Sequence, residues 1–70
     1  MSTGEQVARV TEIIAESPKG VEDAVQVGFK RAVSTLRGIT GLRIMEMRVS
    51  VKENKIATYR VKMEVIFILD

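Results

Sequence analysis

Residues 56–69 read IATYRVKMEVIFIL, and the alternation of side chains in this stretch decides the fold. The odd positions are apolar or amphipathic, namely Ala57, Tyr59, Val61, Met63, Val65, Phe67 and Leu69. The even positions from Thr58 to Glu64 are polar, after which Ile66 and Ile68 break the pattern. A period of two predicts a strand with its odd positions on a core. We expect Ile66 and Ile68 to be exposed in a single chain and therefore covered by another subunit.

A second strand is predicted directly before this one, from Leu42 to Val51. The link between the two strands reads KENK, residues 52–55, and is short and polar. Asn54 tolerates the left-handed backbone of a tight turn. The two strands are therefore expected to form an antiparallel hairpin.

Upstream of the hairpin, apolar residues recur at three- and four-residue steps from Val21 to Leu36. This period predicts a helix that packs one apolar stripe on a sheet. Gly28 and Ala32 are small members of the stripe, and we expect them to allow close helix–sheet packing, with a binding role as the alternative. Gly38 is expected to end the helix.

The chain begins with a third strand-like segment, VARVTEIIA, from Val7 to Ala15. Ser17 and Pro18 follow it and resemble a helix N-cap with proline in the first turn. A right-handed crossover through the helix leaves room for the last strand between the other two. We predict an α+β fold: a β-α-β-β subunit whose three-stranded antiparallel sheet, in the order 1-3-2, partly wraps one helix. Residues 1–70 form a single domain, in which residues 1–6 are expected to be flexible.

The composition argues against catalysis. The chain has no Cys and no His, so disulfides, thiol nucleophiles and the commonest general base and metal ligand are all missing. The neighbouring acids Glu22 and Asp23 would point in different directions on a helix, and no spaced acids form a calcium loop. We therefore expect a protein that is not an enzyme and has no metal site. Because so small a domain is marginal alone, oligomerisation is the remaining means of stabilisation.

No apolar run approaches the ~20 residues of a membrane span, and the N-terminus lacks the pattern of a signal peptide. A cytoplasmic location without a membrane partner is expected. The pI is 9.3, yet the formal net charge is only +2, which gives little reason to expect a polyanionic partner. The few aromatic residues include Tyr59 and Phe67 at core-facing positions, so no base-stacking surface for a nucleic acid is predicted.

Arginines on the predicted hairpin are the residues of interest. Arg48 and Arg60 occupy even positions and share their face with the polar neighbours Glu46 and Lys62. One interpretation is a charged sheet surface with cross-strand Arg–Glu pairs. The other is a site for an anionic, nucleotide-like ligand, because guanidinium groups suit bidentate phosphate recognition.

Taken together, two segments resemble a known family. These are RVTEIIAESPKGVEDAVQVGFKRAVSTLRGITGL and ATYRVKMEVIFILD, which are similar to the first half and the final strand of the dodecins. The resemblance extends from Val7 to Leu69. It implies a β-α-β-β subunit, a hollow shell of twelve copies and no enzymatic activity. It also implies storage or buffering of a flavin, FMN or riboflavin, whose ring stacks between tryptophans of symmetry-related chains.

The chain departs from the family pattern at the implied flavin site. The resemblance places Gly41 where the stacking tryptophan stands, Leu42 at the neighbouring aromatic position and Arg60 at the flavin-bonding glutamine. Arg48 matches an arginine of bacterial members. A glycine supplies no aromatic face, and a guanidinium only donates hydrogen bonds. The implied cofactor-binding positions are therefore Gly41, Leu42, Arg48 and Arg60, without the stacking tryptophan.

Two functions remain open from the sequence. The first is a homododecameric shell that binds, stores or buffers a small molecule, either a flavin or another phosphate-bearing coenzyme. The second is a dodecin-type assembly that has lost flavin binding and acts as an ion-binding or structural shell. The departures at Gly41 and Arg60 favour the second, and the family resemblance favours the first.

Overall fold

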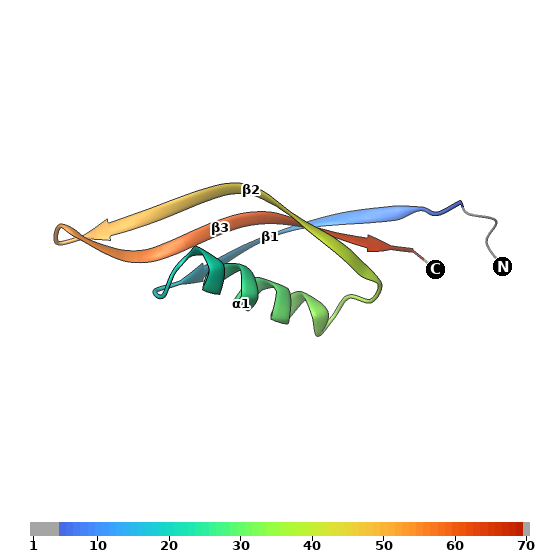
Figure 1. Ribbon diagram of the computed structural model, residues 1–70, viewed down its shortest axis with the longest axis horizontal. Coiled ribbons are helices and arrows are strands. Elements are labelled where there is room, and N and C mark those ends of the chain that lie inside the picture. The colour runs from blue at the N-terminus through green and yellow to red at the C-terminus, as the bar shows by residue number, and fades with distance from the viewer. Residues whose placement is uncertain (1–4, 70) are drawn as a thin grey trace.

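The computed structural model describes residues 5–69, which form one helix and one sheet (Figure 1). The elements in chain order are β1 (Ala8–Ser17), α1 (Val21–Val33), β2 (Ile39–Lys52) and β3 (Lys55–Ile68). The sheet is antiparallel with the strand order β1-β3-β2. The predicted fold class, element order and sheet order are confirmed. Within the described residues no helix is long and apolar enough to cross a membrane.

The core lies where α1 covers the middle of β3. Val61, Met63 and Val65 have no exposed surface, so the alternation of the last strand predicted its buried face correctly. Ala15 of β1 and Ala24 of α1 complete the cluster, and partly buried neighbours, among them Leu42, pack against it.

The small residues of the helical stripe set how closely α1 approaches the sheet. Gly28 is buried, and a Cβ atom built on it would overlap Met63 Cε and lie 3.1 Å from Ala15 Cβ. Ala32 is also buried on the same face. The expected close packing at Gly28 and Ala32 is confirmed.

The junction between β1 and α1 differs from the prediction. β1 continues two residues beyond Ala15, to Ser17, which pairs with Tyr59 of β3. The N-cap is Gly20, so Ser17 is not the cap. Its buried hydroxyl instead donates to Asp23 Oδ2 at 2.5 Å and accepts the backbone N–H of Lys19 at 3.0 Å. Ser17 therefore joins the end of the strand to the first helical turn from outside the helix.

The helix is shorter than predicted and ends at Val33. The hydroxyl of Ser34 donates to the Arg31 carbonyl at 2.6 Å. Such side-chain bonds compete with continuation of the helix. Gly38 lies beyond the helix end, in a left-handed conformation with φ of 71°. Its carbonyl accepts the N–H of Ile68 at 3.0 Å, which ties the turn into β2 against the end of β3.

The expectation that Ile66 and Ile68 are exposed in a single chain is wrong. Both are half-buried, because β3 is the central strand. Ile66 lies between Val10 of β1 and Gly41 of β2. The predicted flexibility of residues 1–6 falls mainly on residues 1–4, which lie outside the described part of the chain; residues 5–6 are exposed and precede β1.

Candidate functional site

The sheet face that points away from α1 carries the two arginines of interest. Arg48 lies directly opposite Arg60, and Glu46 lies opposite Lys62, across the β2–β3 pair. Directly opposed residues of an antiparallel pair share a face. The structure therefore brings Arg48 and Arg60 together, as their even positions predicted.

Each arginine also contacts a carboxylate. Arg60 donates from Nε and Nη2 to Glu16 Oε2, at 3.1 and 2.7 Å, across the β1–β3 pair. Arg48 Nη2 donates to Glu46 Oε2 at 3.2 Å on its own strand. These side chains are about half exposed or more, and exposed ion pairs contribute only about 0–1 kcal/mol. These pairs orient the guanidinium groups but contribute little free energy.

A small recess lies between these charged side chains. It encloses about 130 Å³ and is lined by Ile14, Glu46, Arg48, Arg60 and Lys62. Three of its five lining side chains are cationic, and each of them has a carboxylate partner. Besides the two arginine pairs, Lys62 Nζ lies 3.7 Å from Glu12 Oε1. Pockets for drug-sized ligands enclose about 300–1,000 Å³. This recess thus offers space for a phosphate-sized group and not for a flavin ring.

Gly41 and Leu42 lie elsewhere on the subunit and on opposite sides of the sheet. Gly41 is opposite Ile66 on the outward face, and Leu42 is opposite Val65 on the helix face. Leu42 packs against the core. At ~3.3 Å per residue, Gly41 and Arg48 are roughly 20 Å apart along β2. Within one chain Gly41 and Leu42 therefore do not contribute to the recess at Arg48 and Arg60.

The backbone at Gly41 leaves room for a side chain. A Cβ atom built there would meet only Ile66 Cδ1, at 3.7 Å, which is an ordinary contact. A Cβ atom therefore fits at this position, and the fold does not require a glycine there.

Two features of the site were not predicted. Ile14 is the one apolar residue that lines the recess, and it is exposed on the outward face. The register of β1 against β3, which the sequence did not supply, decides which face it occupies. Glu16 was missed as the partner of Arg60 for the same reason. Within residues 5–69 no three acidic side chains gather closely enough to hold a metal ion.

Comparison with known proteins identifies the family. The Dodecin family model matches residues 7–70. The chain belongs to the dodecin family. The dodecin of Thermus thermophilus is 32% identical over 65 residues, covering 93% of this chain and 94% of that protein. The dodecin of Streptomyces davaonensis superposes with a TM-score of 0.90 at 36% identity, over 96% of this chain and 98% of its own.

The description of a third dodecin names an ion. The structure of a calcium dodecin from Mycobacterium tuberculosis, described as a calcium-chelating antigen with a novel calcium-binding site, is 33% identical with a TM-score of 0.80, covering 91% of each chain. The fold of this dodecin is thus shared by relatives over nearly its whole length.

Proposed function

We propose that this dodecin is a non-enzymatic, cytoplasmic shell of twelve copies that binds and buffers a small phosphate-bearing ligand. The observation that carries the ligand class is the recess that gathers Arg48, Arg60 and Lys62. The carboxylates that pair with these cations are themselves about half exposed. Guanidinium groups bind phosphate oxygens through paired, charge-assisted hydrogen bonds. The absence of Cys and His from the chain is consistent with binding instead of catalysis.

Self-association is supported by how much surface the subunit exposes. A compact monomer of this mass would expose about 4,400 Å², whereas this chain of 7.8 kDa exposes 5655 Å². A compact 70-residue domain would also have a radius of gyration of about 11 Å, against 14.9 Å here. The exposed surface and the radius of gyration both exceed those of a compact monomer, which supports association with other copies.

The ligand is proposed to be FMN or another phosphate-bearing coenzyme, recognised through its phosphate and not through its ring. Gly41 offers no aromatic face to an isoalloxazine, and the recess at Arg48 and Arg60 has the size of a phosphate. FMN and riboflavin share the ring and differ in the phosphate. The proposal therefore predicts that FMN binds appreciably more tightly than riboflavin.

Titration of the purified assembly with FMN and with riboflavin, followed by flavin fluorescence, tests this proposal. Arg48→Ala and Arg60→Gln should each weaken FMN binding by roughly tenfold, because a charge-assisted hydrogen bond contributes about 1.5–3 kcal/mol. Arg43→Ala is the matched control, since Arg43 also lies on β2 but pairs with Glu64, outside the recess. Equal affinities for FMN and riboflavin, or equal losses in all three variants, would contradict phosphate recognition.

A second function, a shell that has lost flavin binding and holds an ion or serves structurally, is favoured by two observations. Arg60 is already bonded twice to Glu16, and a relative of 33% identity is a calcium dodecin. Three results together would support this alternative. The assembly would keep its mass, neither flavin would bind, and calorimetry would record heat released on addition of calcium.

A further inference from the structure

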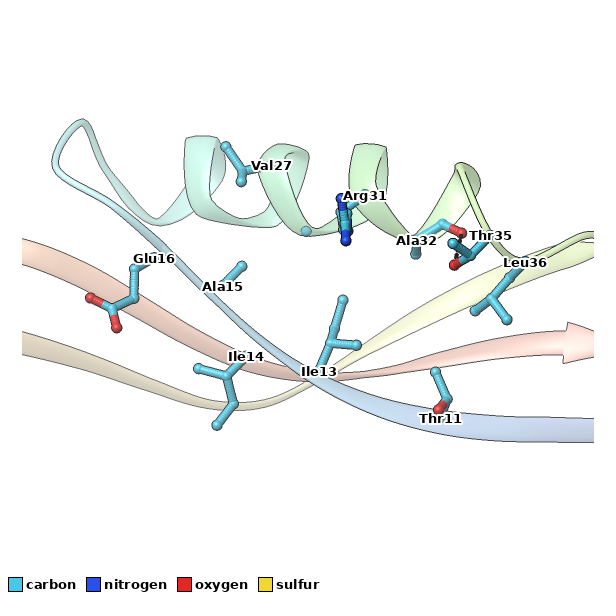
Figure 2. Close-up of a pocket in the computed structure, with 11 residues that line it drawn as sticks. Thr11, Ile13, Ile14, Ala15, Glu16, Val27, Arg31, Ala32, Thr35 and Leu36 are labelled. Carbon is cyan, nitrogen blue, oxygen red and sulfur yellow. Dashed lines mark hydrogen bonds between the residues drawn. The ribbon is translucent and has the colours of Figure 1, made fainter.

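Glu16 lies beside the cationic recess without lining it. It is directly opposite Arg60 across the β1–β3 pair. Figure 2 shows Glu16 and Ile14 pointing away from α1, whereas Ala15 between them points toward the helix. Glu16 Oε2 accepts two bonds from Arg60, from Nε at 3.1 Å and from Nη2 at 2.7 Å. Because the recess is lined by Arg60 and not by Glu16, the carboxylate holds the guanidinium from outside the space that a ligand would occupy.

Arg60 is placed between Glu16 and a second arginine. β3 lies between β1 and β2, and Arg48 of β2 is directly opposite Arg60. Like charges that are directly opposite each other on a strand pair are destabilising. Glu16 therefore attracts the Arg60 guanidinium toward β1, away from Arg48, and its bonds occupy the Nε–Nη2 edge of that group. An anion between the two arginines would attract the same guanidinium toward β2, so Glu16 and the anion compete for it.

The charge balance around the recess determines which anions gain by binding. Each of its three cations is paired with one carboxylate, so these six side chains together have no net charge. A monoanion that displaces one carboxylate replaces one negative charge by another. A phosphate monoester carries nearly two negative charges at neutral pH and has three terminal oxygens, so it can bond both guanidinium groups. A phosphodiester carries one charge and gains less.

We infer that Glu16 competes with the ligand for Arg60 and thereby restricts the recess to dianionic phosphate monoesters. This inference rests on the proposed phosphate site and narrows its ligand class to a terminal phosphate, such as that of FMN, in preference to an internal phosphodiester. Arg60 stands where the resemblance to dodecins implies a flavin-bonding glutamine. Since a glutamine forms no ion pair, the competition by Glu16 is a consequence of this departure from the family pattern.

Phosphorus NMR titration of the purified protein with methyl phosphate and with dimethyl phosphate tests the ligand class. The first probe is a monoester and the second is a diester, and the phosphorus signal of either broadens when it binds a larger molecule. At pH 8 and fixed ionic strength, methyl phosphate should bind roughly tenfold more tightly, because its second negative charge is attracted to both guanidinium groups. Equal affinities of the two probes would overturn the restriction to monoesters and leave phosphate binding intact.

Glu16→Gln tests the competition itself. The affinity for methyl phosphate should rise about two- to fivefold, which is the extent to which one exposed ion pair can compete. Glu64→Gln is the matched control, because it removes the same charge from β3 but Glu64 pairs with Arg43, outside the recess. In an Arg60→Gln background, Glu16→Gln should change nothing, since the cation for which it competes is absent. An equal gain in the control, or a gain that persists without Arg60, would overturn the role of Glu16.

Failure of the phosphate site itself gives a different result. If neither probe binds the unaltered protein or Glu16→Gln, the proposed phosphate recess and this inference are both wrong. If both probes bind the unaltered protein equally and Glu16→Gln leaves both affinities unchanged, only this inference is wrong. Light scattering confirms that each variant keeps the native mass of the unaltered protein, so that a lost affinity is not mistaken for a lost fold.

Discussion

Gly41 lies at the outward-facing start of β2, beside Ile66, and space above it is open. Its backbone does not need the freedom of glycine, because an added Cβ would make only one ordinary contact. The backbone therefore gives no reason for a glycine at this position. The resemblance to dodecins predicted that an aromatic side chain is missing here, and the structure shows that a Cβ atom would fit.

Gly41→Trp should create or strengthen binding of the flavin ring. Aromatic stacking contributes about 0.5–1.5 kcal/mol per pair beyond the burial of area, so riboflavin affinity should rise by roughly tenfold. Gly41→Leu is the control, because it adds apolar bulk without an aromatic face. Fluorescence titration with riboflavin measures both variants. Equal gains in the two variants would show that area, and not stacking, is what the glycine removes.

Single residues also show which contacts the sequence alone could not predict. The even positions of Arg48 and Arg60 predicted that they share a face, and the register shows that they oppose each other. The sequence could not show that Arg60 donates hydrogen bonds to Glu16 or that Ile14 lines the recess. Both residues come from β1, which is distant in sequence, and only the pairing of β1 with β3 places them there.

At the scale of the elements, the β2–β3 hairpin is the most local feature and was predicted well. Glu53 and Asn54 form its two-residue turn and both have positive φ, at 50° and 62°. This is the geometry of a type I′ turn, whose twist matches that of paired strands. The helix end was predicted less well, because the hydroxyl of Ser34 bonds the Arg31 carbonyl and periodicity does not record such a competing bond.

Asn54→Val should destabilise the hairpin. A β-branched residue is poorly tolerated in the left-handed region, which costs an ordinary L-residue about 1–2 kcal/mol. The free energy of unfolding should fall by that amount in a denaturant titration at fixed protein concentration. Lys52→Val is the control, because Lys52 ends β2 in extended backbone, where valine is favoured. If both substitutions had the same effect, the turn conformation would not be what Asn54 supports.

At the scale of the whole molecule, the subunit is elongated, with extents of 57 × 20 × 14 Å. The sequence indicated oligomerisation because a small chain without Cys or His lacks other means of stabilisation. It located the exposed apolar residues at Ile66 and Ile68, which the structure shows to be half-buried. Exposed apolar side chains lie on all four elements, with the largest group on β2. Sequence periodicity could not show this, because coverage by the helix depends on where α1 crosses the sheet.

Self-assembly is the claim on which the proposed shell depends. Multi-angle light scattering of the purified chain at micromolar concentration tests it most directly. The account predicts one species with a mass twelve times that of the 7.8 kDa subunit, unchanged on dilution through the micromolar range. A stable, monodisperse species at the mass of one subunit would contradict it.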